Sequence, residues 1–184
     1  MATTAAGTPY VESSDLVATY PGVSLALANH IDTSTGKVLQ VVSVTKVNTF
    51  STSSISYVDI TGLTASITPS ATSSKILVLT KIAVNTPTAA IAAMQIMRGA
   101  TAIGGGTAVG IRVSATSSYF GASLGTDDLN GNFLDSPASI TAQTYKIQCR
   151  VSNNTVSINT THDEANNVHR ARTSSTITLM EISA

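Results

Sequence analysis

From residue 37 onward, apolar and polar side chains alternate in short runs, and this period of two constrains the fold more than any other feature. Successive side chains of a strand point to opposite faces, so alternation predicts sheets with one buried face. About ten short strands, spaced roughly ten residues apart with turn signals between them, predict an all-β fold, an antiparallel β-sandwich of the jelly-roll type with about 8–10 strands. The predicted strands are residues 37–47, 55–60, 63–68, 75–84, 89–98, 107–114, 118–123, 144–151, 155–160 and 176–182.

Two of these strands need separate comment. Residues 75–84 are almost continuously apolar, which predicts a central strand with both faces covered. Residues 89–98 are rich in alanine and would favour a helix in isolation, but the strands on both sides and the turn at Gly99 favour a strand. Asn153 and Asn154 predict a hairpin turn, and residues 127–136 and 161–175 are predicted to be polar loops.

Residues 1–36 follow a different pattern. Ser24 is a suitable cap for a short helix over residues 25–32, where the apolar spacing is helical. A helix this short is marginal in water, so it needs a partner surface. We therefore expect a short helical or extended leader, residues 1–36, that acts as an N-terminal attachment segment before a β-sandwich domain of residues 37–184; the alternative is an inert, frayed leader. The residues expected to dock are Tyr10, Leu16, Val17, Leu25, Leu27 and Ile31.

Composition narrows the function. Hydrophobic residues make up 42% of the chain and charged residues only 11%, with a formal net charge of zero; ordinary domains carry about 25% charged residues. A basic patch for nucleic acid is missing, so nucleic-acid binding is not expected. Membrane insertion is not expected either, because no run approaches the roughly 18 apolar residues that span a bilayer. A neutral surface rich in Ser and Thr suits a protein buried against copies of itself.

The sequence resembles a known group of virus proteins. Residues 36–42, 55–63, 66–78, 133–137 and 176–182 are similar to virion proteins of tailed bacteriophages from aquatic bacteria, and the likeness covers residues 36–184. Residues 9–17 resemble N-terminal modules that such phages join to different distal domains. The resemblance implies a virion location after synthesis in the host bacterial cytoplasm, docking to other phage virion proteins through residues 1–36, and no catalytic residues. It leaves open a tail-fibre or host-recognition module, which would bind a host surface glycan or protein, and a capsid decoration protein.

A second resemblance concerns architecture. The strand order and the final apolar strand are similar to the trimeric jelly rolls of the complement C1q and tumour-necrosis-factor heads. That likeness implies a homotrimer whose strand faces meet around a threefold axis. The ring-bearing contacts it implies are Tyr57, Tyr119, Phe120 and Tyr145.

Motifs for other chemistry are weak. Gly104, Gly105 and Gly106 lack the following Lys-Ser/Thr of a phosphate loop. The single cysteine, Cys149, lies in an alternating run, which favours a buried small hydrophobe over a reactive thiol. No cofactor is expected. The metal-site candidates are His162, Asp163 and His169, and a second oxygen cluster is Asp127, Asp128, Asn130 and Asn132; both read more simply as solvated loop tips, where receptor contacts also tend to lie.

Enzymatic activity is the least favoured interpretation. No Gly-x-Ser-x-Gly motif of a hydrolase is present. A carbohydrate-active enzyme would need two acids facing each other across a cleft. We do not expect such a pair of acids in this protein. The candidate acids are Asp59, Asp127, Asp128, Asp135, Asp163 and Glu164.

Overall fold

The computed structural model describes residues 38–87, 89–121, 125–161 and 163–183, together with the backbones of two short strands near the N-terminus. The chain divides into two compact units, Met1–Lys37 and Val38–Ala184. In the first unit β1 (Ala2–Thr3) pairs antiparallel with β2 (Pro9–Tyr10), and β2 contains the predicted docking residue Tyr10. The predicted helix over 25–32 and the docking residues Leu16, Val17, Leu25, Leu27 and Ile31 lie outside the described residues.

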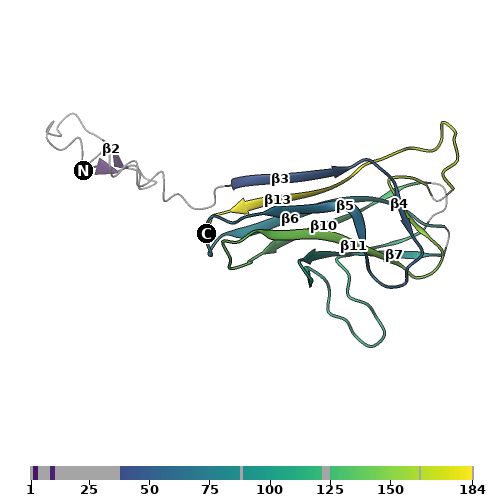
Figure 1. Cartoon of the computed structure of the whole chain (residues 1–184), viewed down its shortest axis with the longest axis horizontal. Helices are drawn as coiled ribbons and strands as arrows, with labels where there is room; N and C mark the ends of the chain where they lie inside the picture. The colour runs from purple at the N-terminus through teal and green to yellow at the C-terminus, as the bar shows by residue number, and fades with distance from the viewer. Residues whose placement is uncertain are drawn as a thin grey trace. The chain divides into compact units, whose positions relative to one another are not determined.

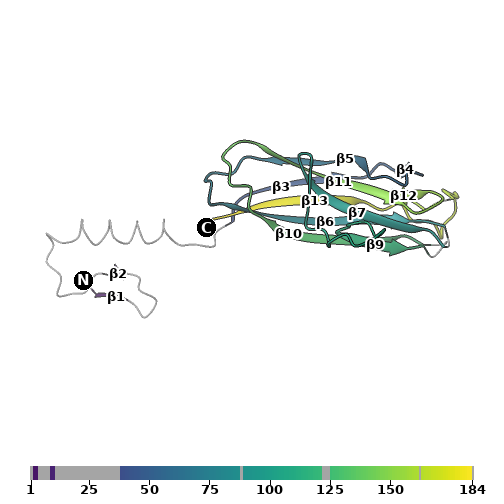
Figure 2. The same cartoon turned by 90° about the horizontal axis from the view of Figure 1, so that it is seen from below.

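The second unit consists of two antiparallel sheets packed face to face (Figures 1 and 2). In the first sheet, β3 (Val38–Lys46), β13 (Ser175–Ile182), β6 (Lys75–Asn85) and β10 (Asp127–Asp135) lie side by side, and β12 (Val156–Ile158) and β4 (Phe50–Thr52) extend it. In the second sheet, β5 (Val58–Ile67), β11 (Gln143–Val151) and β7 (Ile91–Arg98) are followed by β8 (Thr101–Ile103) and β9 (Ser117–Phe120), which both pair with β7. The described residues form no helix. The predicted all-β sandwich is confirmed.

The strand pairs are nested in the order of the chain. β3 pairs with β13, β5 with β11, β6 with β10, and β7 with β9. The outermost pair therefore joins the first and last strands of the sandwich, and the innermost pair joins neighbours. Nested antiparallel pairs divided between two sheets define the jelly roll that the sequence predicts.

Alternation places one side of every long strand in the core. On β13, Ile177 and Leu179 are fully buried, whereas Thr176, Thr178 and Met180 point the other way. The core also contains Tyr145, Leu63, Ile60 and Ile147. Cys149 is a core residue, and burial raises the pKa of its thiol to about 12. A protonated, buried thiol behaves as the small hydrophobe that the sequence favours.

A buried polar cluster links the two sheets. Arg98 of β7 donates from Nη1 to both carboxylate oxygens of Asp135, at 2.8 and 2.7 Å, and the Tyr145 hydroxyl donates to Asp135 Oδ2 at 2.7 Å. Asp135 ends β10 in the first sheet, while Arg98 and Tyr145 belong to the second. Burial, and then the hydrogen bond to Asp135, raises the pKa of the Tyr145 hydroxyl. The cluster thus satisfies a buried charge and ties β10 of the first sheet to β7 and β11 of the second.

A second buried carboxylate anchors the end of β13. Glu181 is fully buried and accepts hydrogen bonds from the Ser70 amide and hydroxyl and from Gln40 Nε2, each at 2.6 Å. Burial alone would raise the pKa of this carboxyl, but the donors from Ser70, Gln40 and Ser74 outweigh it and lower the pKa to about 2. The charged form is therefore the one that the fold stabilises.

Glu181 is expected to make the fold acid-sensitive. Its folded pKa of about 2 lies below the ordinary value of 4.5, so its contribution is complete above pH 4.5 and is lost as the pH falls towards 2. The difference in unfolding free energy between the wild type and the Glu181→Gln variant should narrow over this window, by at most about 1.4 kcal/mol per pH unit. Urea unfolding followed by circular dichroism at several pH values measures it. A difference that stays constant from pH 5 to pH 2 would contradict the assignment.

Several predicted elements are wrong, each for a physical reason. Residues 127–136, predicted as a loop, form β10, because Leu129 and Phe133 face the core while polar neighbours alternate outwards. Residues 107–114, predicted as a strand, lie in a loop, because β8 and β9 already pair with the available edge of β7. The Asn153-Asn154 turn joins strands of different sheets and is not a hairpin turn, although Asn154 does have a positive φ of 60°.

Other predictions hold with a change of detail. Residues 89–98 do form a strand, β7. The two strands predicted on either side of Gly62 are one strand, β5; Gly62 has a φ of 87° and interrupts the alternation, so that Ile60 and Leu63 both face the core. β6 is central in its sheet as predicted, but only one of its faces is covered along its first half, because Leu79 on the other face is 38% exposed.

Candidate functional site

The exposed side of β6 belongs to a larger surface. We call the side of β3, β13, β6 and β10 that points away from the core the outer face. Four apolar side chains cross this face in register: Met180 lies opposite both Val41 and Leu77, and Leu77 lies opposite Leu134. Val41 is 55% exposed and Leu134 48% exposed, at the two ends of this apolar row. Leu39, 45% exposed, extends it on β3.

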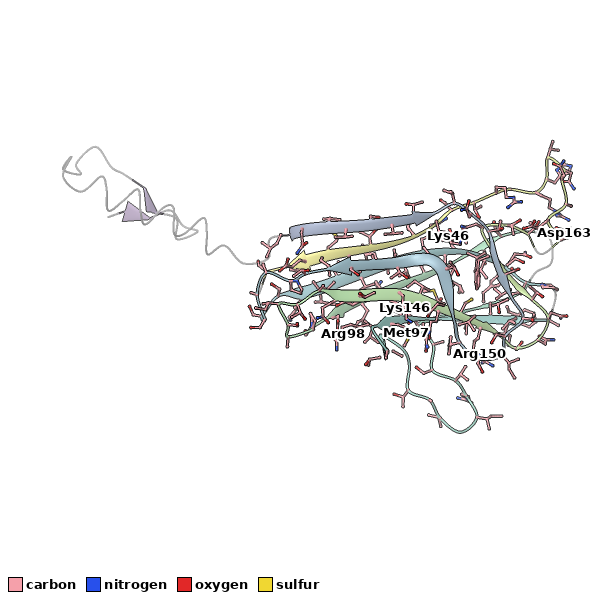
Figure 3. The ribbon with its side chains drawn as sticks, viewed as in Figure 1. Lys46, Met97, Arg98, Lys146, Arg150 and Asp163 are labelled. Carbon is pink, nitrogen blue, oxygen red and sulfur yellow. The ribbon has the colours of Figure 1, made fainter. Side chains whose placement is uncertain are left out.

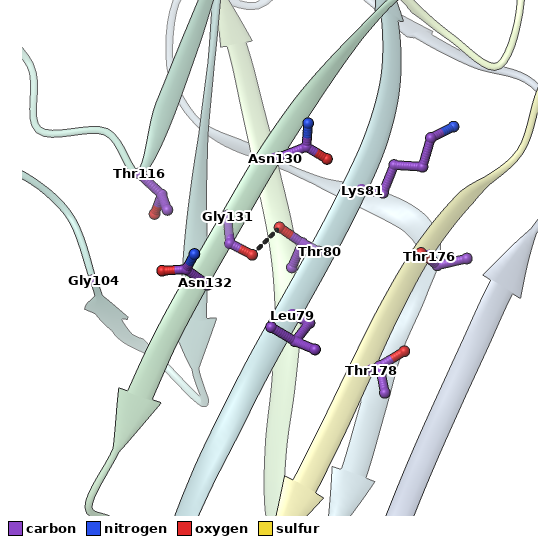
Figure 4. Close-up of a pocket in the computed structure, with 10 residues that line it drawn as sticks. All are labelled: Leu79, Thr80, Lys81, Gly104, Thr116, Asn130, Gly131, Asn132, Thr176 and Thr178. Atoms are coloured by element: carbon purple, nitrogen blue, oxygen red, sulfur yellow. Dashed lines mark hydrogen bonds between the residues drawn. The ribbon is translucent and has the colours of Figure 1, made fainter.

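The neighbouring positions of the outer face are polar except for Leu79, which lies between Thr178 and Asn132. Thr178 lies opposite Ser43, with their hydroxyls 2.8 Å apart, and the next position along β13 is Thr176. Asn130 and Asn132 of β10 face the same way, and Lys81 forms an ion pair with Asp128 at 3.1 Å. A shallow depression of about 460 Å³ lies over these residues (Figure 4). The outer face therefore has an apolar half and a hydroxyl- and amide-rich half.

Gly131 lines the depression, and there is no room for a side chain on the core side of β10 at this position. A Cβ at this position would lie 2.8 Å from Thr80 Oγ1, 2.9 Å from Met94 Cε and 3.0 Å from Thr116 Cγ2. The lining of the depression also includes Thr116 and Gly104, beyond β10 (Figure 4). The Thr80 hydroxyl donates to the Gly131 carbonyl at 3.3 Å.

The other side of the sandwich is different. On the exposed side of β5, β11 and β7, Lys146 pairs with Asp59 at 2.8 Å, and Gln148 donates to Asp59 at 2.7 Å. Gln95 donates to Gln148 at 2.7 Å, so polar side chains from all three strands interlock. Hydrogen bonds from Lys146 and then Gln148 lower the pKa of Asp59. Figure 3 labels Lys146, Met97 and Arg98 on these strands. On this side the polar groups of the three strands pair with one another, whereas on the outer face a row of large apolar side chains crosses the strands.

The outer face has the size and composition of a contact surface. Four strands about 4.8 Å apart and about eight residues long at about 3.3 Å per residue cover on the order of 500 Å². A standard protein interface buries about 800 Å² per partner, which is the same order. Contiguous exposed apolar side chains rimmed by polar ones mark interaction sites. The outer face can therefore bury the apolar surface of a partner, and the strand pairing holds its side chains in fixed positions.

The aromatic residues predicted as trimer contacts lie elsewhere. Tyr145 is fully buried in the core, so its ring has no surface to offer a partner. Tyr57 is half-buried beside β5, where burial raises its pKa and its hydroxyl donates to the Ser114 carbonyl at 2.6 Å. Tyr119 packs against the core from β9, and its neighbour Phe120 is 62% exposed. None of these four residues belongs to the strands of the outer face.

The predicted metal loop holds ion pairs. Asp163 accepts from the Thr161 hydroxyl and from Arg170 Nη2, each at 2.8 Å, and these hydrogen bonds lower its pKa (Figure 3 labels Asp163). His169 donates from its backbone amide to Asn167 Oδ1 at 2.9 Å, and His162 lies outside the described residues. Within the residues that the structure describes, no three His, Cys, Asp or Glu side chains come together in a group that could hold a metal.

Most of the candidate acids for glycoside chemistry are paired with cations. Asp59 pairs with Lys146, Asp128 with Lys81, Asp135 with Arg98, Asp163 with Arg170, and Glu164 with Arg172 at 3.6 Å. The remaining candidate, Asp127, accepts from the backbone amide of Asp128 at 2.7 Å. Asp59 belongs to β5, the acids at 127, 128 and 135 belong to β10, and those at 163 and 164 belong to the loop between β12 and β13. No helix among the described residues has the length and apolarity to cross a bilayer.

Comparison with known proteins gives only distant structural neighbours. No protein-family model matches the chain, and no curated protein matches it. Three solved structures of infectious bursal disease virus resemble it at 14% sequence identity over 79% of this chain: the Gt strain (TM-score 0.42), the T=1 particles (0.41) and the VP2 subviral particle (0.40). The chain spans 36–38% of the length of those viral chains. At these scores the likeness assigns neither family nor function. The fold class of this chain, an antiparallel jelly-roll sandwich, rests on its strand pairing alone.

Proposed function

We propose that this protein is a non-enzymatic structural component of a virus particle that assembles as a homotrimer through the outer face. The observation that carries the proposal is the apolar row, Val41, Met180, Leu77 and Leu134, which crosses four strands in register, with its two middle residues partly exposed and its two ends about half exposed. An isolated chain would gain stability by covering it, at about 25 cal/mol for each Å² of apolar area buried.

The composition supports the same proposal. With only 11% charged residues and no net charge, the chain has little charge repulsion between copies. Hydroxyl and amide groups on the polar half of the outer face can form hydrogen bonds between copies without the desolvation cost of charges. The ion-paired acids give no reason to add a catalytic role.

The resemblance of residues 36–184 to tailed-phage virion proteins supports the assignment of the protein to a virus particle. In this proposal residues 1–36 dock the trimer to other virion proteins, and the exposed loops of the jelly roll contact a host surface glycan or protein, as a tail-fibre module does. A capsid decoration role differs in copy number, which is a few to dozens per particle for a fibre and hundreds for a decoration protein. Quantifying the protein in purified particles separates the two.

Light scattering of the purified chain tests the assembly. We expect three chain masses for the wild type at micromolar concentration and one for a Leu77→Glu/Leu134→Glu variant, because burying two carboxylates in the interface is costly. Thr64→Glu places a single carboxylate on the exposed side of β5, away from the outer face, and should remain trimeric.

Circular dichroism must show that the two variants and the wild type are equally folded. A wild type that is monomeric would end the proposal. So would a Leu77→Glu/Leu134→Glu variant that keeps three chain masses, because the outer face would then be uninvolved.

A further inference from the structure

A second exposed apolar feature lies away from the outer face. The loop of residues 104–116 joins β8 to β9 and projects from the sandwich (Figure 1). Large apolar side chains alternate along it: Val109 is 64% exposed, Ile111 is fully exposed and Val113 is half exposed. The glycines at 104, 105, 106 and 110 bring no side chains that would cover them. Apolar side chains held in water on a projecting loop mark contact with a partner.

A groove lies between this loop and the second sheet. Its volume is about 380 Å³, and we call it the loop groove. Ile91 and Ala93 of β7 form its apolar base, Ile111 and Val113 come from the loop, and Arg150 comes from β11. Figure 3 labels Arg150 beside the base of the loop. The groove is concave and apolar, and therefore suits inserted side chains better than a flat surface.

The charges at the groove are all positive. Arg112 and Arg150 line it, and no Asp or Glu does. Arg150 donates from Nε to the Ile55 carbonyl at 2.6 Å. Neither guanidinium forms an ion pair with any residue that the structure describes. An occupant that matches the groove therefore carries carboxylates next to apolar side chains.

The chain itself contains such a segment. Residues 1–36 hold three acidic residues, Glu12, Asp15 and Asp32, and no Lys or Arg, for a net charge of −3. Residues 37–184 hold all ten Lys and Arg and the other seven acids, for a net charge of +3. Within residues 11–17, Glu12 and Asp15 stand among Val11, Leu16 and Val17. The net charge of zero thus conceals an acidic segment and a basic domain.

We propose that the loop groove of one copy binds residues 11–17 of a second copy, with Glu12 and Asp15 at Arg112 and Arg150 and the apolar side chains against Ile91 and Ile111. The inference rests on the proposed function, since assembly supplies the second copy, and it names one partner of the leader. Twenty-one residues lead from Val17 to Val38. Extended, they reach up to about 70 Å, which is enough to link one trimer to another.

Disulfide trapping between full-length chains tests the contact. A Leu16→Cys variant is mixed with an Ile111→Cys variant, and mixed disulfide dimers are followed on non-reducing gels. The native Cys149 is buried with a raised pKa and does not compete. The matched control pairs Leu16→Cys with Ile140→Cys, since Ile140 is a 60% exposed aliphatic residue outside the groove. We expect the Ile111→Cys pair to cross-link about tenfold faster than the control pair.

Charge changes then test the recognition. Arg112→Glu in the Ile111→Cys chain should slow cross-linking on the order of tenfold, as expected for the loss of one charge-assisted hydrogen bond. Glu12→Arg/Asp15→Arg in the Leu16→Cys chain should restore the rate against an Ile111→Cys partner in which both groove arginines are reversed, Arg112→Glu/Arg150→Glu. Raised salt should slow the wild-type pair.

The outcomes separate this inference from the proposed function. Trimers whose two cysteine pairs cross-link at equal rates would overturn the inference and leave the trimer intact. Fast trapping between chains that light scattering shows to be monomeric would support the groove and reject the trimer. Binding of the wild type, but not of an Ile111→Ser variant, to phosphatidylserine vesicles would assign the loop to a lipid surface and overturn the inference.

Discussion

Replacing Asp135 with alanine is expected to lower the free energy of unfolding by about 3 kcal/mol or more, because removing one partner of a buried ion pair leaves the other charge uncompensated. Asp135 receives Arg98 through two hydrogen bonds and the Tyr145 hydroxyl through a third, and its side chain is only 7% exposed. The carboxylate also links β10 of the first sheet to β7 and β11 of the second, so the variant loses a contact between the sheets as well. Urea unfolding of the variant, followed by circular dichroism, measures the loss.

The surface pair of Asp59 and Lys146 provides the matched control. Its N–O distance, 2.8 Å, is nearly that of the buried pair, but the Asp59 side chain is 51% exposed. Exposed ion pairs contribute about 0–1 kcal/mol, so Asp59→Ala should change stability by less than about 1 kcal/mol. Equal losses for the two variants would show that burial is not what makes the Asp135 cluster important.

Truncating Leu179 to alanine is expected to cost about 2–5 kcal/mol. Leu179 is fully buried on β13, between β3 and β6, and packs in the core between the sheets. Removing its side chain sacrifices buried apolar area and leaves a cavity that rigid neighbouring strands cannot fill. The same unfolding experiment gives the value.

Ile140→Ala is the control for that truncation. Ile140 lies outside the strands and is 60% exposed, so its loss should stay within about 0.5 kcal/mol of the wild type. A Leu179→Ala variant as stable as Ile140→Ala would mean that β13 is not the central strand that its pairing indicates.

The fold could largely be predicted because alternation records burial directly. Ser175 to Ile182 alternates clearly, Lys75 to Asn85 is a nearly continuous apolar run, and both form strands close to the predicted limits. β10 was missed because its outward residues are Asp and Asn and its inward positions include Gly131, a composition that usually marks a turn. Residues 107–114 alternate as a strand does, yet local pattern does not reveal that no sheet edge is free to pair with them.

The candidate site was harder to predict, for a related reason. The sequence predicts aromatic side chains as the contacts between copies, but Tyr145 is buried in the core, where its hydroxyl donates to Asp135. The apolar row depends on register between strands far apart in the chain, such as Val41 beside Met180, which no single segment encodes. The available signal was the nearly continuous apolar run of β6. This run predicts that both faces of β6 are buried, whereas in the structure only the face towards the core is buried and the other is partly exposed.

The nested pairing also determines the order in which the strands can pair during synthesis. β13 pairs with β3 on one side and with β6 on the other, although the paired residues are more than 90 positions apart in the chain. During synthesis, β3 and β6 leave the ribosome before β13, the strand that lies between them in the sheet. Their edges stay unpaired and their apolar sides stay uncovered until residues 175–182 emerge. Contacts between such distant segments form slowly. The nascent chain is therefore exposed to mispairing with its neighbours for most of its translation, which favours chaperone attendance until the last strand arrives.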